Sequence, residues 1–290
     1  MGRRRGAGWA RDALVLLAVL GLMALAGWGF AGLVERGRPR RQAFSRDMER
    51  ALARAVEASV RAGGDIVDDP AVTDLIDGIA SRLDAGMRAL AGDSAVPPDL
   101  IILVADSDAV NAVAFPGNLI VVYAGLMRAL DGPQELAGVL AHEAGHCVSN
   151  DSRNALIREL GLSVLIGASG AGAAGEMAGE VVRSAVRIRY GRRAEERADR
   201  FAVDLLASSG LDPAAFARAL EALEESTGRL PDIVRYMDVH PPLERRIDDA
   251  RARAADVADD PALKPVVLKT SWDSEWTAAL AVLPTALDPP

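Results

Sequence analysis

Hydrophobic positions in the first third of the chain recur at the spacing of amphipathic helices. Residues 41–62 carry one apolar stripe at helical spacing, and two glycines follow it. A second helix is predicted from Pro70, a residue suited to a first helical turn, to about Leu90. Pro97-Pro98 then ends this helical region, which we place at residues 41–98.

The hydrophobic pattern then changes to short runs rich in β-branched residues. Leu100–Ala105 and Leu119–Tyr123 are predicted strands. Pro116-Gly117-Asn118 is a predicted turn between two extended segments. The sequence therefore predicts a small antiparallel sheet. An extended peptide could pair with an exposed edge of this sheet, and a hairpin that serves packing alone is the alternative. The candidate substrate strand is Asn111, Ala112, Val113, Ala114 and Phe115.

Helical patterns dominate the remainder of the chain. A short helix begins at Gly125, and Pro133 starts a longer one over about 133–150. The apolar run Leu160–Ile166 is too short to span a bilayer, and a further helix is predicted over 177–189. The expected fold class is therefore α+β, predominantly α, with one small antiparallel sheet.

The N-terminal region contains a candidate membrane segment. Residues 13–34 are 22 uncharged, mostly apolar residues, which is long enough for one transmembrane helix. A cleaved signal peptide, with Ala24-Leu25-Ala26 at the cleavage site, is the alternative. The apolar run continues to Val34, which favours an uncleaved anchor. Arginines flank the segment on both sides, so charge does not set its orientation.

Composition and charge restrict the classes of function. The chain has 290 residues, is 50% hydrophobic and carries a net charge of −8. Its basic part lies beside the apolar N-terminal segment, which indicates membrane topology, and we expect no nucleic-acid partner. Cys147 is the single cysteine, so no intramolecular disulfide can form. We expect it to be a small buried side chain and not a metal ligand.

The motif His142-Glu-Ala-Gly-His146 carries the strongest chemical indication. Residues four apart lie on one face of a helix, so the two imidazoles can bind one Zn²⁺. Glu143 follows about 100° around the helix, where its carboxylate can take a proton from water activated by the metal. This combination is typical of a metallopeptidase.

The motif requires a third ligand, and several candidates remain open. Ser149 and Ser152 stand where one zincin pattern has glycine and histidine, so that pattern is absent. A glutamate on a later helix is the alternative. Glu195 has Asp199 four residues on, which could accept the outer N–H of a zinc-bound imidazole. A solvated charged face is the competing interpretation of this pair. The other acidic candidates are Glu159, Glu176, Glu180 and Glu196.

His240 is the remaining histidine of the chain. It precedes Pro241-Pro242, and Pro242 is predicted to start a helix. A lone histidine is usually structural, but a peptidase needs a group that stabilises the tetrahedral oxyanion. His240 is therefore a candidate for that role.

Together these segments resemble the membrane-associated zinc metallopeptidase family of the heat-shock protease HtpX and the CAAX prenyl protease. The layout is similar to the single-anchor periplasmic branch that includes the mitochondrial protease Oma. The matching motifs occur in family order and cover about residues 65–255. They are Asn111–Gly117, Tyr123–Leu126, His142–His146, Arg192–Asp199 and His240–Ile247.

The resemblance implies a gluzincin-type metalloendopeptidase with one Zn²⁺ per chain. It assigns His142, His146 and Glu195 as ligands and Glu143 as the base. It also implies that His240 reaches the active site, either as a transition-state helper or as an inhibitory extra ligand. The expected substrates are misfolded or membrane-associated proteins, with a role in protein quality control at the cell envelope. A latent or non-catalytic membrane-anchored chaperone that uses the same groove is the rival hypothesis.

The expected organisation has four parts. Residues 1–40 form the basic N-terminus and anchor, 41–98 the helical preamble, 99–255 the peptidase core and 256–290 a tail with no assigned role. By analogy, the expected location is a bacterial inner membrane with a periplasmic catalytic domain, or the periplasm after signal cleavage. The sequence leaves the oligomeric state open. It departs from the family at Gly191, Asn118 and Asn150-Asp151, outside the proposed ligands.

Overall fold

The computed structural model describes the chain from residue 45 onward, with gaps. The described residues are 45–62, 66–92, 99–161, 174–226, 240, 243–258 and 272–283. The predicted membrane segment 13–34 lies outside them. Contacts separate residues 1–45 from a second unit, Arg46–Pro290, and all the elements below belong to that unit. Within the described residues, no helix combines the length and hydropathy that crossing a bilayer requires.

Three short strands form a mixed sheet at the centre of this unit. They are β1 (Ile101–Ala105), β2 (Ala112–Phe115) and β3 (Leu119–Tyr123), in the order β1-β3-β2. β3 pairs antiparallel with β2 and parallel with β1. The prediction of a purely antiparallel sheet is therefore wrong. The continuous apolar run of β3 suits a central strand buried on both faces, and that position gives it a parallel neighbour as well as its hairpin partner.

The turn between β2 and β3 follows the predicted chemistry. Gly117 has φ +85° and Asn118 has φ +61°, both in the left-handed region that these two residue types tolerate. A Cβ on Gly117 would lie 2.6 Å from the backbone oxygen of Glu49. The turn can therefore pack directly against helix α2 (Arg46–Ala62) only because residue 117 has no side chain.

Helix α3 (Pro70–Ala91) begins where the sequence predicted. The side chain of Asp69 accepts a hydrogen bond from Ala71 N at 2.9 Å, and Pro70 occupies the first turn. Its buried stripe of Leu75, Ile79 and Leu83 belongs to the main core. This stripe anchors α3 against the sheet and the later helices.

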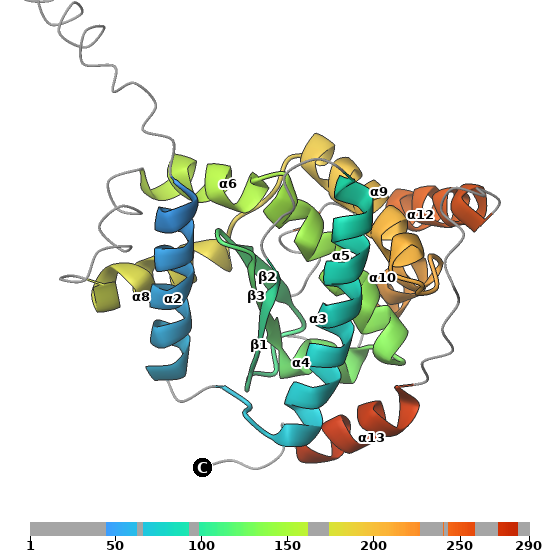
Figure 1. Ribbon diagram of the computed structural model, residues 1–290, viewed down its shortest axis with the longest axis horizontal. Helices are drawn as coiled ribbons and strands as arrows, with labels where there is room; N and C mark the ends of the chain where they lie inside the picture. The colour runs from blue at the N-terminus through green and yellow to red at the C-terminus, as the bar shows by residue number, and fades with distance from the viewer. Residues whose placement is uncertain are drawn as a thin grey trace, which may run out of the picture. The chain divides into compact units, whose positions relative to one another are not determined.

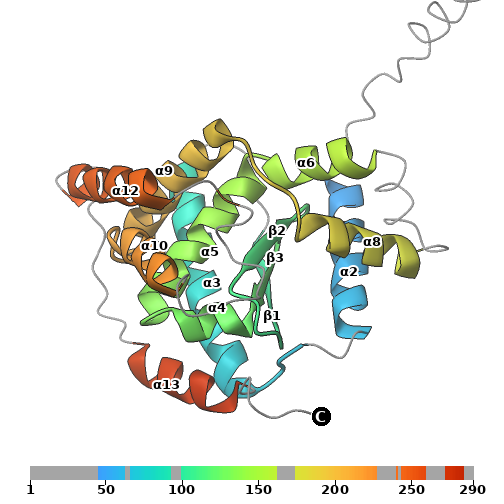
Figure 2. The same cartoon turned by 180° about the vertical axis from the view of Figure 1, so that it is seen from behind.

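Helix α5 (Pro133–Val148) follows the short α4 (Ala124–Ala129) and is the central helix of the unit. Figures 1 and 2 show it between the sheet on one side and helices α9, α10 and α12 on the other. Helices α2 and α8 lie on the opposite side of the sheet. Every residue of α5 from Glu135 to Cys147 is buried, so side chains on all its faces meet protein. This position explains how one helix can hold several polar groups away from water.

Six further helices lie within the described part of the unit. They are α6 (Asp151–Leu160), α8 (Ala174–Ala185), α9 (Arg192–Ser208), α10 (Ala215–Ser226), α12 (Leu243–Ala258) and α13 (Asp273–Val282). The helix predicted over 177–189 is α8, which begins and ends earlier than expected. Helix α13 lies in the tail that the sequence left unassigned, and it packs on α3 through the buried Trp272 and Trp276.

Candidate metal centre

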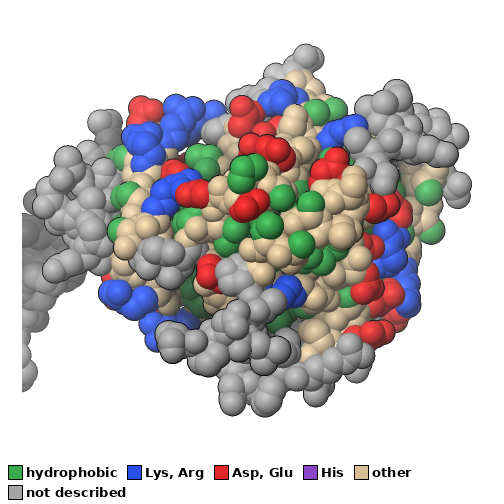
Figure 3. Space-filling view, turned by 90° about the horizontal axis from the view of Figure 1, so that it is seen from below, with side chains coloured by type: hydrophobic (Ala, Val, Ile, Leu, Met, Phe, Trp, Pro, Cys, Tyr) green, Lys and Arg blue, Asp and Glu red, His purple; other side chains and the backbone are tan. Residues whose placement is uncertain are grey.

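Helix α5 places His142, Glu143 and His146 inside the protein. All three side chains are almost fully buried. His142 and His146 are one turn apart and face the same side, so their Nε2 atoms lie 3.1 Å from each other. Figure 3 shows charged and hydrophobic side chains scattered over one face of the molecule, and no histidine is visible on that face.

Helix α9 brings Glu195 and Asp199 against the same region. A Cβ on Gly145, within the His-Glu-x-x-His motif, would lie 3.0 Å from the Cα of Ala198 on α9. The glycine therefore permits the two helices to approach closely. This approach places Glu195 Oε1 3.5 Å from His146 Nε2 and Glu195 Oε2 3.7 Å from His142 Nε2.

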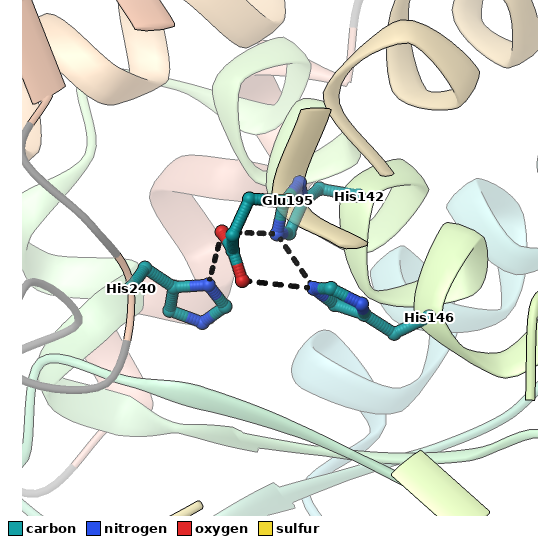
Figure 4. Close-up of side chains that lie close together, drawn as sticks. All are labelled: His142, His146, Glu195 and His240. Atoms are coloured by element: carbon teal, nitrogen blue, oxygen red, sulfur yellow. Dashed lines mark hydrogen bonds and ion pairs between the residues drawn. The ribbon is translucent and has the colours of Figure 1, made fainter. Parts of the chain in front are cut away.

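His240 reaches the cluster from the segment that precedes α12. Its Nδ1 lies 2.8 Å from Glu195 Oε2. The candidate ligand atoms of His142, His146, Glu195 and His240 all lie within 4.8 Å of one another, and all four residues are buried. Figure 4 shows the carboxylate of Glu195 directed between the three imidazoles. The chain thus gathers all its histidines around one carboxylate.

The outer nitrogens of the two α5 histidines face carboxylates. Asp199 Oδ1 lies 2.9 Å from His142 Nδ1, and Asp151 Oδ2 lies 3.4 Å from His146 Nδ1. These acceptors favour a proton on each Nδ1, which leaves both Nε2 atoms with lone pairs. Two lone pairs and a carboxylate that converge in a buried space favour a cation between them.

The pKa values of the two histidines indicate that a proton takes one of these two lone pairs at neutral pH when no metal is bound. Burial lowers the pKa of His142 to about 3, although Asp199 opposes the shift. Burial also disfavours charge on His146, but Asp151 and Glu195 outweigh it and raise its pKa to about 9. At neutral pH one proton therefore supplies positive charge between the rings. The donor set of two imidazoles and a carboxylate suits a zinc ion in place of that proton.

Glu195 remains a carboxylate in spite of its burial. Burial alone would raise its pKa, but His240 and the two α5 histidines hold the pKa well below the usual range. Arg246 on α12 contributes a guanidinium nitrogen 3.2 Å from Glu195 Oε2. The same guanidinium pairs with both oxygens of Asp199, at 2.7 and 2.8 Å. The buried negative charges are thus balanced by neighbouring cations.

Glu143 lies beside the cluster with a free oxygen. Its carboxyl group accepts a backbone hydrogen bond from Ala114 on β2, and burial raises its pKa to about 8. Its Oε1 has no hydrogen-bond partner among the residues that the structure describes. That atom is 3.8 Å from His240 Nε2. An unpartnered carboxyl oxygen with a pKa near neutrality is suited to taking up and releasing a proton.

The candidate substrate strand forms an edge of the sheet next to α5. Residues 112–115 are β2, which pairs with β3 on one side only among the described strands. Asn111 precedes β2, is fully buried, and donates nothing from its Nδ2 to any described residue. Its Oδ1 accepts from Ala112 N at 2.9 Å. The structure therefore places the strand beside Glu143 through Ala114, with a buried amide donor at its start. All four residues of β2 are buried, so the prediction that this edge is exposed is wrong.

Several residues of the centre were not identified from the sequence. Asp151 beside His146 and Arg246 beside Asp199 are described above. Tyr190 stacks on His146 with ring centroids 3.9 Å apart, and Phe216 stacks on His142 at 5.4 Å. Arg246 lies in a motif that the sequence analysis noted, but nothing in its spacing indicates a contact with α9. Asp151 was noted only as a departure from the family pattern, and no motif distinguishes Tyr190 or Phe216.

Cys147 follows the expectation for a small buried residue. Its side chain is buried, and its Sγ donates to the carbonyl oxygen of Phe115 at 3.7 Å. Burial and the nearby Glu143 raise the pKa of the thiol far above its usual value. The thiol therefore stays protonated, and it is not among the atoms that converge on Glu195.

Comparison with known proteins identifies the family. The model of Peptidase family M48 matches residues 80–254, which is more than half of the chain. The chain therefore belongs to peptidase family M48, a metallopeptidase family, as the motifs indicated.

The chain is similar in sequence to proteases of bacteria and mitochondria. It is 28% identical over 233 residues to the beta-barrel assembly-enhancing protease of Yersinia pestis, a match that covers 75% of this chain and 46% of that one. It is 30% identical over 156 residues to the metalloprotease YcaL of Escherichia coli, covering 50% and 59% of the two chains. With the mitochondrial metalloendopeptidase OMA1 of Schizosaccharomyces pombe it shares 26% identity over 139 residues, covering 47% and 41%. The chain spans about half the length of the curated relatives that it matches.

Proposed function

We propose that the protein is a zinc-dependent metalloendopeptidase whose catalytic core is residues 99–255. One observation carries this proposal: the Nε2 atoms of His142 and His146 converge with the buried carboxylate of Glu195. Membership of peptidase family M48 supports it independently. In this proposal His142, His146 and Glu195 hold one zinc ion per chain, and Asp199 orients His142. Zinc bound there would supply Lewis-acid chemistry, which polarises a peptide carbonyl and acidifies water.

Glu143 acts as the catalytic base in this proposal. Its Oε1 takes a proton from the attacking water and then delivers that proton to the leaving amine. Burial keeps its pKa near 8, so the same carboxyl group can hold and release a proton close to neutral pH. The backbone N–H of Ala114 holds the other end of the carboxyl group and thus directs Oε1.

The edge of β2 is the proposed substrate-binding element. An extended peptide would add to this edge and run beside α5, so that its scissile bond lies near Glu143. The hydrogen bond between Ala114 and Glu143 supports this placement, because it ties the strand to the catalytic base. The side-chain amide of Asn111 offers a buried donor at the start of the same strand.

His240 allows two versions of the function. As a catalytic helper, its imidazole would stabilise the developing oxyanion. As an extra ligand, it would hold a latent enzyme closed, and its place in the four-residue cluster favours this second version. His240→Ala separates them, because a helper predicts lower peptidase activity and an inhibitory ligand predicts higher activity.

The names of the relatives support a proposal for the substrate class and location. We propose misfolded or membrane-associated proteins as substrates and quality control at the cell envelope as the role. The names of relatives support this, since they include a beta-barrel assembly-enhancing protease and a mitochondrial metalloendopeptidase. The proposed location is the inner membrane, with the predicted segment 13–34 as anchor and the core in the periplasm. Release into the periplasm after signal cleavage is the alternative.

The test compares the full-length protein with Glu143→Gln. Both are assayed for zinc content and for cleavage of casein, an unfolded model substrate. We expect about one zinc in each and cleavage only by the wild type, because the glutamine cannot accept the proton. Full zinc-dependent cleavage by Glu143→Gln would overturn the mechanism. Zinc in both without cleavage in either would favour the latent form or a holding function.

A further inference from the structure

His146 is held by a group of side chains that mirrors the group around His142. His142 Nδ1 faces Asp199, which pairs with Arg246. His146 Nδ1 faces Asp151 at 3.4 Å, and Asp151 Oδ1 accepts from the guanidinium of Arg197 at 2.9 Å. Each imidazole of α5 therefore faces a carboxylate, and that carboxylate in turn pairs with an arginine.

The backbone between α5 and α6 explains why Asp151 reaches His146. Asp151 is five residues after His146, and on a continuous helix it would lie about 140° around from it. Instead α5 ends at Val148, and Asn150 adopts the left-handed conformation with φ +56°. The turn starts α6 at Asp151 and directs its carboxylate back to the last turn of α5. The contact is therefore produced by a residue suited to this conformation, not by helical spacing.

Tyr190 restrains the ring of His146 from another element. It lies just before α9, and its ring is nearly parallel to the imidazole, with 16° between the planes and 3.9 Å between the centroids. A stacked ring opposes tilting and rotation of the imidazole. Tyr190 and Asp151 thus restrict different motions of one side chain, since one fixes the plane and the other fixes the Nδ1 direction.

We propose that Asp151 is a positioning residue of the metal centre, which holds the Nδ1 proton of His146 so that its Nε2 is available to zinc. Tyr190 assists by fixing the ring plane, and Arg197 holds the carboxylate in place. This inference rests on the proposed zinc site. In zinc proteins, carboxylates that orient ligand histidines contribute about 10- to 100-fold in metal affinity.

The two arginines differ in exposure, although the carboxylates that they contact do not, and this difference sets the expected sizes of effect. Arg246 is 8% exposed, whereas Arg197 is 50% exposed. An ion pair with an exposed arginine contributes little on its own. We therefore expect Asp151 to matter much more than Arg197 for zinc affinity.

The test measures the zinc dissociation constant by competition with a chromophoric chelator. Full-length wild type, Asp151→Ala, Asp151→Asn and Glu159→Ala are compared. Glu159 is an exposed acidic residue on the same helix and serves as the matched control. We expect Asp151→Ala to raise the dissociation constant about 10- to 100-fold. Asp151→Asn should raise it less, because the amide oxygen still accepts from Nδ1, and Glu159→Ala should equal the wild type.

The visible spectrum of the cobalt-substituted protein provides a second readout. A displaced His146 changes the ligand field, so the absorption bands of Asp151→Ala should shift while those of Glu159→Ala do not. Tyr190→Phe should retain the wild-type zinc affinity and Tyr190→Leu should lose affinity, because only phenylalanine preserves the stacked ring. Equal affinity in the two Tyr190 variants would overturn the role of that ring.

Two outcomes separate this inference from the proposed function. If the wild type binds zinc and Asp151→Ala binds it with the same affinity and cobalt spectrum, the positioning role is wrong and the zinc site stands. If the wild type binds no zinc, the proposed function itself fails. Asp151→Asn keeps the size of the side chain, so its zinc affinity and cobalt spectrum test the positioning role if Asp151→Ala does not fold.

Discussion

At the scale of single residues, the centre depends on balanced buried charge. Arg246 pairs with both oxygens of Asp199 and lies 3.2 Å from Glu195, and all three side chains are at most 10% exposed. Removing the arginine takes away the guanidinium that both buried carboxylates contact when no metal is bound. Neither the motif nor its spacing indicates how much of the stability of the metal-free protein depends on this one side chain.

We predict that Arg246→Ala lowers the free energy of unfolding of the metal-free protein by about 3–5 kcal/mol. The neighbouring Arg245 is the matched control, because its side chain is 80% exposed and pairs loosely with Asp249 at 3.6 Å. Arg245→Ala should change the free energy by less than about 0.5 kcal/mol. Urea unfolding in the presence of a chelator measures both. Similar values for the two variants would contradict the assigned role of Arg246.

The residues of the metal centre that could be predicted from the sequence differ from the others in how the fold brings them there. His142, Glu143 and His146 share one helix, so their spacing alone predicted that they lie together. Glu195 and Asp199 were found because a third ligand was required. Asp151 could not be found in this way, because its contact depends on the left-handed turn at Asn150.

At the scale of elements, β1 and α3 meet through a buried carboxyl group. Asp84 on α3 is buried and accepts from Leu100 N, just before β1, at 3.0 Å. Burial raises its pKa above the usual 3.8, although this hydrogen bond opposes the shift. The contact joins the two elements at the cost of placing a charge away from water.

This carboxyl group predicts a pH-dependent stability. The folded protein holds the proton of Asp84 more tightly than the unfolded chain, so its contribution is full below pH 3.8 and is lost as pH rises through the raised pKa. The free energy of unfolding of the wild type relative to Asp84→Asn should therefore fall as pH rises above about 4. Urea unfolding of the wild type and of Asp84→Asn at several pH values above about 4 measures this difference in the free energy of unfolding. Asp74→Asn, on the exposed side of α3, is the control, and a relative stability that rises with pH would refute the assignment.

The elements themselves were predictable to different degrees. The start of α3 at Pro70 and the start of α5 at Pro133 follow from local residue chemistry, and both occur as predicted. The parallel direction of the pairing between β1 and β3 does not follow from local residue chemistry, because it depends on which strand occupies the centre of the sheet. Local patterns determine where elements begin, whereas strand order is decided by packing between distant segments.

At the scale of the whole unit, the C-terminal helix is part of the core. Trp272 and Trp276 belong to the same hydrophobic cluster as α3, α5 and α9. The sequence left this tail without a role, because two tryptophans at helical spacing do not specify the surface that covers them. The tail therefore contributes to the stability of the peptidase core.

We predict that Trp276→Ala lowers the free energy of unfolding by about 3–5 kcal/mol, since it removes a large buried ring. Val282→Ala on the same helix is the control, because Val282 is 41% exposed and should lose much less. Urea unfolding monitored by circular dichroism measures both. A loss below about 1 kcal/mol for Trp276→Ala would show that the helix does not pack on the core as described.

The convergence of α5 and α9 creates the proposed metal site, and two adjacent glutamates on α9 distinguish a ligand from a neighbouring charge. The measurement is zinc content and zinc affinity of Glu195→Gln and Glu196→Gln. Glu195 faces the two histidines, whereas Glu196 is not among the four clustered residues. The two variants lose the same charge from the same helix by the same substitution, so they differ only in position. We predict wild-type zinc binding for Glu196→Gln and a loss of more than about 100-fold in affinity for Glu195→Gln, larger than for an orienting carboxylate. Equal zinc binding by the two variants would show that α9 supplies no ligand to the metal.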